Sequence, residues 1–357
     1  MKLDDKDWVA TPIIKLFSRF EACKISNASS FQKVSEKGIE YIAATNRNNG
    51  VLYFIDDDDK SRTVIQSGNC IGFIKDGDGS AGYAIYKKES FASTVNVLYG
   101  YATWLNRYSG LSFVASQDKI RKKYSHGYKR NMEHLKGDRV MLPVEDDGEP
   151  DIHFMADYSK AKEESMLDRY KAFAEKELLK LEYKEIPTLD EKEWKEIPLD
   201  NLFIVNSGKR LENINKHQGT RPFIGATDNG NGITGFVDND NDSKDKNVLG
   251  INYNGAPCIA FYHPYECIFS DDVKRLHLKE RFDNKYILLF FVSIFAKQKT
   301  KYNYGYKFNA QRMKRQMLMV PIKENGTPDY EYMEQYAKNL MYKKYNQYLS
   351  YLKSKNC

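Results

Sequence analysis

Short apolar runs alternate with polar turn residues along most of the chain, a pattern that predicts strands joined by tight turns. The runs are rich in β-branched and aromatic residues, and clusters of Asn, Asp and Gly separate them. The expected strands lie at residues 38–43, 51–55, 70–74, 83–86 and 140–144. One stretch in each half, residues 93–108 and 284–297, is long enough for a helix. Each half is therefore predicted to be a compact α+β domain.

Two long segments without Pro or Gly follow these domains, and both are predicted to be helices. Each begins after a Gly-x-Pro-Asp break, so Asp151 and Asp329 stand at the N-cap, where a carboxylate accepts hydrogen bonds from the first turn. The first helix is expected to run to about Tyr183 and to end before Pro187. The second helix is expected to run nearly to the carboxyl terminus.

Each predicted helix carries one apolar stripe, because its large apolar residues recur mostly at three- and four-residue spacings. The stripes comprise Met155, Met166, Tyr170, Phe173, Ala174, Leu178 and Leu181 in the first helix and Met333, Ala337, Leu340, Met341, Tyr345, Tyr348 and Leu352 in the second. A helix of about 30 residues is roughly 45 Å long, which exceeds the width of about 35 Å expected for either domain. The two helices are therefore predicted to pair as an antiparallel coiled coil.

The sequence of the first half recurs in the second half, so the two domains are predicted to be tandem repeats. The strongest match pairs residues 124–160 with residues 302–338 without a gap, and a Gly-Tyr-Lys motif recurs within it. Shorter matches pair residues 8–17 with 194–203, 40–56 with 222–238 and 79–86 with 255–262. The predicted organisation is a first domain at 1–150, a helix and linker at 151–190, a second domain at 191–328 and a last helix at 329–357.

The composition indicates a cytosolic chain. The 357 residues are 41% hydrophobic and 29% charged, and no run of about 18 apolar residues is present. The amino terminus carries no apolar signal segment, so a cytoplasmic location without a membrane partner is expected. The five cysteines contain no C-x-x-C motif, so we expect reduced thiols. The net charge of +6 is compatible with a polyanionic partner without requiring one.

The sequence lacks the motifs that mark common catalytic sites. No phosphate-binding G-x-x-x-x-G-K-[ST] motif is present. Residues 77–82 spell G-x-G-x-x-G, but they join two predicted strands, so a tight turn is expected. No N-P-P-Y or D-P-P-Y element is present, and the acidic run at 56–59 is expected to be a solvated turn rather than a cation site. The sequence therefore predicts a non-catalytic protein without a cofactor or metal of its own.

Two clusters of basic residues interleaved with tyrosines lie at equivalent places in the repeats. The first comprises Lys119, Arg121, Lys122, Lys123, Lys129 and Arg130 with Tyr124 and Tyr128. The second comprises Lys297, Lys299, Lys301, Lys307, Arg312, Lys314 and Arg315 with Tyr302, Tyr304 and Tyr306. Basic side chains neutralise phosphates, and tyrosines can contact bases or sugars, so the recurrence favours DNA binding over a solvated surface. His126 can be read equally as a surface residue or as a base or phosphate contact.

A second candidate surface is the Asn- and Gly-rich loop that recurs in both halves. Its candidate contacts are Asn46, Arg47 and Asn48 in the first half and Asp228, Asn229 and Asn231 in the second. Amide side chains can donate and accept hydrogen bonds in the major groove of DNA. The same residue types also form tight turns, and the sequence leaves both interpretations open.

Two α+β domains, each followed by a long helix, together with the Gly-Tyr-Lys blocks and the Gly-x-Pro-Asp breaks, resemble the DNA specificity (S) subunits of Type I restriction-modification systems and their Type IIB relatives. The resemblance covers essentially the whole chain, and the duplicated order is its most specific feature. It implies two target recognition domains, each reading one half of a split double-stranded DNA sequence. It also implies that the helices are spacers that set the distance between the halves and dock methyltransferase subunits.

The resemblance implies that the chemistry resides in partner subunits. Two adenine methyltransferase subunits per chain would bind S-adenosylmethionine, and restriction would come from a translocase subunit or from a fused methyltransferase-nuclease. The chain and its spacers are short for a Type I subunit, and Gly-x-Pro-Asp replaces the Pro- and Glu-Gln-rich pattern common before Type I spacers, so the system type stays open. The main alternative is a stand-alone duplicated DNA-binding regulatory protein.

The candidate residues follow from the clusters and the stripes. The candidate DNA contacts are Asn46, Arg47, Asn48, Lys119, Arg121, Lys122, Lys123, His126, Tyr128, Lys129, Arg130, Asp228, Asn229, Asn231, Lys299, Lys301, Tyr304, Tyr306, Lys307 and Arg312. The candidate contacts of the spacer helices are Met155, Met166, Tyr170, Phe173, Leu178, Met333, Leu340, Met341, Tyr345 and Tyr348.

Overall fold

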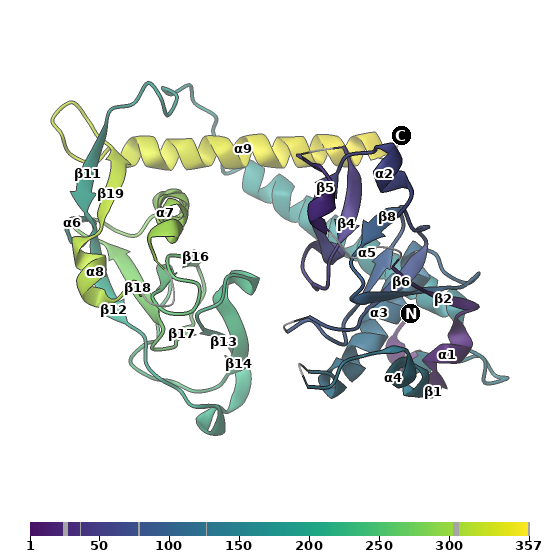
Figure 1. Ribbon diagram of the computed structural model, residues 1–357. Helices are drawn as coiled ribbons and strands as arrows, with labels where there is room; N and C mark the ends of the chain where they lie inside the picture. Colours follow the sequence, from purple (N-terminus) through teal and green to yellow (C-terminus); the bar gives the residue numbers. More distant parts are fainter. Residues whose placement is uncertain (24–27, 36, 78, 126, 303–306, 356–357) are drawn as a thin grey trace. The chain divides into compact units, whose positions relative to one another are not determined.

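The computed structural model describes residues 1–23, 28–35, 37–77, 79–125, 127–302 and 307–355 (Figure 1). The chain divides into two compact units, Met1–Tyr170 and Lys171–Cys357. The boundary falls inside helix α5 (Ile152–Leu178), so most of this helix belongs to the first unit and its last turns belong to the second. Each unit contains one of the two sequence repeats.

The first unit is built on three sheets. The largest has the antiparallel order β2 (Arg19–Ala22), β9 (Val97–Tyr101), β6 (Cys70–Ile74) and β7 (Ala84–Lys87). The second has the order β3 (Lys33–Val34), β5 (Val51–Ile55), β4 (Ile39–Ile42) and β8 (Phe91–Ser93), in which β4 and β8 run parallel. The third pairs β1 (Trp8–Pro12) antiparallel with β10 (Arg139–Pro143). The helices are α1 (Ile13–Leu16), α2 (Asp59–Arg62), α3 (Arg107–Gln117), α4 (Met132–Gly137) and the start of α5, with 3-10 turns η1 (Leu3–Asp5), η2 (Ala28–Ser30), η3 (Asn48–Gly50) and η4 (Asp118–Lys123).

The second unit has three corresponding sheets. The largest has the antiparallel order β12 (Phe203–Ser207), β18 (Val273–Leu278), β15 (Val248–Asn252) and β16 (Ala260–His263). The second has the order β14 (Ile233–Val237), β13 (Gln218–Ile224) and β17 (Ile268–Phe269), in which β13 and β17 run parallel. The third pairs β11 (Trp194–Pro198) antiparallel with β19 (Met317–Pro321). The helices are α6 (Leu199–Leu202), α7 (Lys285–Lys297), α8 (Ala310–Arg315) and α9 (Tyr330–Lys355), with 3-10 turns η5 (Asn213–Asn215), η6 (Gly230–Gly232) and η7 (Lys299–Lys301).

The sequence repeat is therefore also a repeat of fold. The strand order β2-β9-β6-β7 recurs as β12-β18-β15-β16, and the parallel pair β4-β8 recurs as β13-β17. The start of the main helix is also repeated. The Asn106 side chain accepts hydrogen bonds from two first-turn amides of α3, and Asn284 does the same for α7.

Equivalent aromatic pairs form the centre of each core. In the first unit the rings of Phe17 and Phe113 meet edge to face with centroids 5.4 Å apart. In the second unit the rings of Phe203 and Phe291 meet in the same way at 4.7 Å. Phe113, Phe203 and Phe291 are fully buried, and burying each such side chain contributes roughly 1.5–3 kcal/mol. These pairs fix the main helix of each domain against its four-stranded sheet.

Most of the predicted elements are confirmed, with one clear error. The strands predicted at 51–55 and 70–74 are β5 and β6, and the helix predicted at 284–297 is α7. The helix predicted at 93–108 is wrong, because Val97–Tyr101 is the buried strand β9. This strand is an inner strand of its sheet, and all five of its residues are buried, so both of its faces are covered. It therefore lacks the alternation of polar and apolar residues that identifies a strand. The helix begins only at Arg107.

Both long helices begin at the predicted N-caps. Asp151 accepts a hydrogen bond from the Phe154 amide at 2.8 Å, and Asp329 accepts one from the Tyr332 amide at 3.0 Å. The first helix ends at Leu178, earlier than predicted. Beyond it, the chain runs along α9, whose side chains bind the backbone of this segment. The Asn339 amide donates to the Lys184 carbonyl at 2.6 Å and accepts from the Lys184 amide at 3.1 Å.

The apolar stripes have two different roles. Met155 and Met333 are buried in the cores of their own domains, so their assignment to helix pairing is corrected. Within the second unit, Ala174, Leu178 and Leu181 pack with α9 residues Met341, Tyr345 and Tyr348. The direction is antiparallel, because Phe173 contacts Tyr345 while Pro187, later in the chain, accepts a hydrogen bond from Tyr332, earlier in α9. A coiled coil along both whole helices stays a prediction.

Candidate nucleic-acid interface

Three loops that are distant in sequence come together in the first domain. They are the asparagine loop (43–50), the glycine loop (75–83) and the basic loop (118–131). A Cβ atom at Gly77 would lie 2.6 Å from the Ala44 carbonyl oxygen, and one at Gly82 would lie 2.9 Å from the Arg121 carbonyl oxygen. Since real Cβ atoms do not approach so closely, glycine is required at both positions. The G-x-G-x-x-G sequence thus serves close loop packing, in agreement with the predicted turn.

The second domain assembles the equivalent three loops. They are its asparagine loop (225–232), its glycine loop (253–259) and its basic loop (297–309). The Asn252 side chain donates to the Thr227 carbonyl at 2.8 Å. Gly255 has φ of +48°, and a Cβ there would lie 3.1 Å from the Ala226 carbonyl oxygen. The same juxtaposition therefore recurs with different side chains.

The basic loop is held to the glycine loop by the same backbone bond in both domains. The Arg130 amide donates to the Lys75 carbonyl at 2.9 Å, and the Phe308 amide donates to the Tyr253 carbonyl at 3.2 Å. Both donors and both acceptors occupy equivalent positions in the repeat. Over the described residues, the basic and glycine loops are thus joined in the same way in both domains, although their side chains differ.

The cations predicted in the first domain mostly lie at the surface. Lys119, Lys122, Lys123 and Lys129 are exposed. Arg121 is half-buried and places its guanidinium 4.3 Å from the centre of the Tyr83 ring. Lys129 pairs with Asp76 at 2.6 Å, and Lys123 approaches Asp138 at 3.4 Å. A hollow of about 350 Å³ lies beside Arg121 and Lys122, between the basic and glycine loops. The surface can therefore accept phosphates, in competition with Asp76.

Tyr128 stands in a stack of aromatic rings. It is 48% exposed, and its ring stacks on Tyr124 at 5.7 Å and on His134 at 4.2 Å. The His134 Nδ1 atom lies 2.6 Å from the Lys129 carbonyl oxygen, which closes the basic loop onto α4. His134 was not among the residues predicted to contact DNA. The only feature of the sequence that could have indicated it is its position shortly after the basic cluster. Its equivalent in the second domain is Arg312.

Arg130 is removed from the candidate DNA contacts. Its side chain is fully buried, and its Nε donates to Asp138 at 2.9 Å while its Nη1 donates to the Gly82 carbonyl at 3.1 Å. Buried charges occur where they are paired, and this pairing leaves no face of the guanidinium for DNA. A run of basic residues in the sequence does not distinguish the one that turns inward from its neighbours.

The second basic loop is only partly described. Lys299 and Lys301 are exposed, and Lys307 and Arg312 are half-buried. The Arg312 Nη1 donates to the Lys307 carbonyl at 2.7 Å, in the manner of His134 and Lys129. The predicted contacts His126, Tyr304 and Tyr306 lie outside the described residues.

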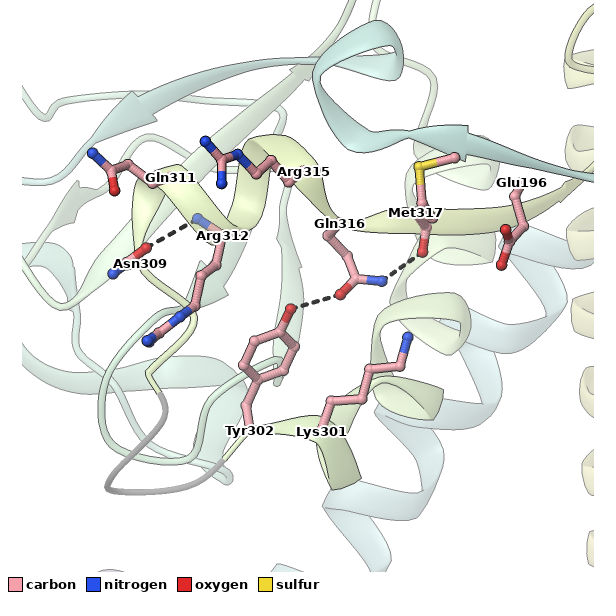
Figure 2. Close-up of a pocket in the computed structure, with 9 residues that line it drawn as sticks. All are labelled: Glu196, Lys301, Tyr302, Asn309, Gln311, Arg312, Arg315, Gln316 and Met317. Carbon is pink, nitrogen blue, oxygen red and sulfur yellow. Dashed lines mark hydrogen bonds between the residues drawn. The ribbon is translucent and has the colours of Figure 1, made fainter.

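A cationic groove of about 810 Å³ lies beside the second basic loop (Figure 2). It is lined by Glu196, Lys301, Tyr302, Asn309, Gln311, Arg312, Arg315, Gln316 and Met317. The Gln316 side chain is fixed at its centre, because its Oε1 accepts from the Tyr302 hydroxyl at 2.6 Å and its Nε2 donates to the Met317 carbonyl at 2.5 Å. Arg315 and Gln311 were not among the candidate contacts, and neither belongs to a motif.

The asparagine loops are turns that also present exposed side chains. Asn49 and Asn231 occupy equivalent positions and have φ of 51° and 53°, a conformation that asparagine tolerates better than most residues. The turn interpretation left open by the sequence is thus confirmed at these positions. The predicted contacts Asn46, Arg47, Asn48, Asp228, Asn229 and Asn231 are all exposed. Ser80 of the glycine loop contacts the Asn46 side chain at 3.4 Å.

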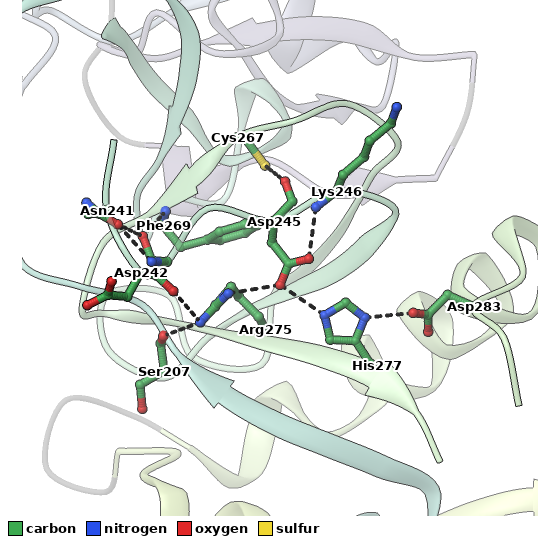
Figure 3. Close-up of polar contacts among 11 residues, drawn as sticks. Ser207, Asn241, Asp242, Asp245, Lys246, Cys267, Phe269, Arg275, His277 and Asp283 are labelled. Carbon is green, nitrogen blue, oxygen red and sulfur yellow. Dashed lines mark hydrogen bonds and ion pairs between the residues drawn. The ribbon is translucent and has the colours of Figure 1, made fainter. Parts of the chain in front are cut away.

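A charged network joins three segments of the second domain (Figure 3). The His277 ring lies 2.9 Å from Asp245 through Nε2 and 2.7 Å from Asp283 through Nδ1. Arg275 donates to the same Asp245 oxygen at 2.9 Å. Hydrogen bonds to Asp245 and Asp283 raise the pKa of His277 to about 9. The network ties β18 to the segment before β15 and to the start of α7.

The described residues show no candidate metal site. They contain no group of three or more His, Cys, Asp or Glu side chains that could hold a metal ion. In the acidic run at 56–59, Asp58 accepts a hydrogen bond from the Ser61 amide as the cap of α2, and Asp57 pairs with Arg62 at 2.8 Å. No described helix is long and apolar enough to cross a membrane.

The chain is similar to known proteins over most of its length. Residues 191–348 match the family model of the Type I restriction modification DNA specificity domain. The Type II restriction enzyme BgcI specificity subunit S.BcgI of Heyndrickxia coagulans is 38% identical over 303 residues, which cover 85% of this chain and 86% of that protein. The S subunit of a Type-I restriction-modification system from M. genitalium is 17% identical with a TM-score of 0.46, covering 99% of this chain and 94% of that one. The HsdS subunit of Thermoanaerobacter tengcongensis is 11% identical with a TM-score of 0.32, covering 98% and 92%.

The similarity to S.BcgI is too long to fall within one repeat, because neither unit contains 303 residues. The family model describes a DNA specificity domain, and the relative is named as the specificity subunit of a restriction enzyme. The prediction of a specificity subunit made from the repeated order and the Gly-Tyr-Lys blocks is thereby confirmed. The chain belongs to the family of restriction-modification DNA specificity subunits.

Proposed function

We propose that the chain reads a bipartite double-stranded DNA target, with one half-site for each cluster of three loops. The observation that supports the proposal is that both clusters share one arrangement while their side chains differ. Lys122 of the first basic loop corresponds to Thr300 of the second, and His134 corresponds to Arg312. Loops that follow the same backbone path but carry different side chains would present different hydrogen-bonding groups to the base edges. Two different half-sequences are therefore expected.

The chain would supply recognition, and its partners would supply the chemistry. DNA adenine methyltransferase subunits, one beside each half-site, would bind S-adenosylmethionine and modify the DNA. Restriction would come from a further subunit or from a methyltransferase fused to a nuclease. The exposed apolar residues of the long helices support a docking role, since Met166 of α5 is 61% exposed and Leu340 of α9 is 49% exposed. The similarity to a Type II specificity subunit supports such a complex.

Selection of bound DNA tests the half-site assignment. The chain, co-expressed with the methyltransferase of its system, is mixed with random duplexes, and the bound sequences are read. We expect two short motifs separated by a gap of fixed length and no sequence preference. The variant Lys122→Gln/Lys123→Gln should weaken the first motif, and its matched variant Lys299→Gln/Lys301→Gln should weaken the second.

Two outcomes would contradict the proposal. A single continuous motif would mean that the clusters do not read separate half-sites. Loss of both motifs from either variant would mean that the site is composite. If the chain selects two motifs but neither copurifies with a methyltransferase nor directs methylation, it is instead a stand-alone DNA-binding protein.

A further inference from the structure

Helices α4 and α8 are equivalent in the repeat but differ in charge. Helix α8 carries Arg312, Lys314 and Arg315 and no acidic residue. Helix α4 carries Lys136, His134 and the acidic Glu133. The position of Arg315 is taken in the first domain by Gly137. The second domain therefore has a strongly cationic helix where the first has a nearly neutral one.

The groove beside α8 is lined by a methionine at a position where the first domain has an arginine. In the first domain, Arg139 folds back and donates to the Ala10 carbonyl at 3.1 Å through Nε and at 2.7 Å through Nη2. Its equivalent in the second domain is Met317, which lines the groove. The repeat of fold alone would not predict this difference, since the two residues lie on the equivalent strands β10 and β19.

The cations of the groove also lack one acidic neighbour that the first domain has. Lys123 approaches the buried carboxylate of Asp138 at 3.4 Å. The equivalents of these two residues are Lys301 and Gln316, so a neutral amide replaces the carboxylate. The one acidic lining residue is Glu196, which stands at the Met317 side of the groove, away from Arg312 and Arg315 (Figure 2).

We propose that this groove binds the sugar-phosphate backbone of DNA beside the second half-site, with Arg315 and Lys301 as phosphate contacts. The inference rests on the proposed function and extends it to a groove whose lining residues Arg315, Gln316 and Met317 are replaced in the first domain. A volume of about 810 Å³ exceeds the need of one phosphate and suits a stretch of backbone with its sugars. Polar amides such as Gln311 would contact backbone oxygens between the cations. The second half-site is then held with more phosphate contacts than the first.

Two neighbouring charges on α8 allow a matched test. Arg315→Gln removes a cation from the groove, whereas Lys314→Gln removes an exposed cation from the same helix that does not line it. Affinity of the full chain for its selected duplex is measured across salt concentrations. Arg315→Gln should flatten the slope of log affinity against log salt by about one, as the loss of one phosphate contact does. Lys314→Gln should change this slope by less than half as much as Arg315→Gln does.

A second arm locates the contact on the DNA. Single phosphates flanking each motif are replaced by neutral methylphosphonates. At one position beside the second motif, the methylphosphonate should weaken DNA binding by the wild type and leave DNA binding by Arg315→Gln unchanged. At no position beside the first motif should the replacement distinguish the wild type from Arg315→Gln in this way. The reverse transplant, Gly137→Arg with Arg139→Met, should steepen the salt slope. A side chain is tolerated at Gly137, because a Cβ there meets nothing within 4 Å.

The proposal is overturned if Arg315→Gln and Lys314→Gln change the salt slope equally, or if neither does. It is also overturned if Arg315→Gln leaves DNA binding intact but reduces copurification with the methyltransferase, because the groove would then bind an acidic surface of that partner. Failure of the wild-type chain to select two motifs would instead contradict the proposed function. Unfolding midpoints of Arg315→Gln and Lys314→Gln should match the wild type, since both residues are exposed.

Discussion

Arg130 and Asp138 form a buried ion pair at 2.8 Å between Nη2 and Oδ2, with side chains 0% and 2% exposed. At the equivalent places, the second domain has Phe308 and Gln316, and Phe308 is also fully buried. The same end of the basic loop is thus anchored by charge in one domain and by an aromatic ring in the other. Both arrangements anchor a basic loop whose exposed residues are candidate DNA contacts.

Arg130→Met should destabilise the first domain by about 3–5 kcal/mol, because it leaves the buried Asp138 carboxylate with a weakened set of partners. Urea unfolding with a probe for the first domain measures the loss. Arg130 also donates a hydrogen bond to Gln117, whose equivalent in the second domain is Phe295. The triple change Gln117→Phe, Arg130→Phe and Asp138→Gln imports the residues of the second domain and should recover at least half of the lost stability. A cost below about 1 kcal/mol for Arg130→Met would contradict the structural role.

His134 should act on DNA binding by positioning the basic loop. His134→Ala removes the contact with the Lys129 carbonyl and the stack on Tyr128. We expect binding to the first motif to weaken by about 1–2 kcal/mol, or five- to thirtyfold, with the second motif unaffected. His134→Arg imports the residue that makes the same contact in the second domain and should retain most of the affinity. Equal loss in both variants would mean that the ring itself contacts DNA.

The repeat was the most informative feature of the sequence, because it is independent of secondary-structure propensity. It predicted the duplicated fold, the caps at Asp151 and Asp329 and the equivalent basic loops. Strand β9 was mistaken for part of a helix because a strand buried on both faces has no alternating pattern.

The candidate interface was predictable as a set of loops but not residue by residue. Spacing along the chain cannot show that Arg130 turns inward to Asp138, or that Arg139 bonds to the Ala10 carbonyl while its equivalent Met317 lines a groove. These outcomes depend on single contacts with residues distant in sequence, such as the Ala10 carbonyl. Met155 and Met333 were assigned to helix pairing for a related reason. One stripe can face its own domain at one end of a helix and another helix at the other end.

The network around His277 should make the second domain less stable at alkaline pH. Its folded pKa of about 9 lies above the ordinary value of 6.5, so its stabilisation is complete below about pH 6.5 and is lost as pH rises through 9. Discounted for partial exposure, the loss is on the order of 1–2 kcal/mol. Asp245 acts at acidic pH. Burial raises its pKa, but hydrogen bonds from His277 and the Lys246 amide, together with the charge of Arg275, outweigh burial and lower the pKa, so its contribution to stability is lost only in acid.

Unfolding measured at pH 6.5 and pH 9 checks the alkaline loss. His277→Gln keeps the size of the side chain, removes the charge and should abolish the difference between the two pH values while lowering stability at pH 6.5. A matched control is His217→Gln, which changes an exposed histidine of the same domain. A wild-type protein equally stable at both pH values would contradict the role of the charged ring.

Helix α5 should act as a spacer that sets the distance between the two target recognition domains. Its residues 164–172 are exposed, whereas Ala174 and Leu178 pack on α9, so an insertion after Asp168 leaves these contacts between the helices in place. Four inserted residues add about one turn, or 6 Å, and nearly preserve the direction of the following stripe. The preferred gap between the motifs should grow by one or two base pairs, at about 3.4 Å each, with both motifs unchanged.

Two inserted residues serve as the control, because they rotate the remainder of α5 by about 200° and add only about 3 Å. They should impair methylation at every gap length between the motifs, since the two target recognition domains could no longer bind the same duplex together. Methylation of oligonucleotides with graded gaps measures both variants in the complex with the methyltransferase. An unchanged optimal gap after the four-residue insertion, in a complex that still assembles, would mean that α5 does not set the spacing.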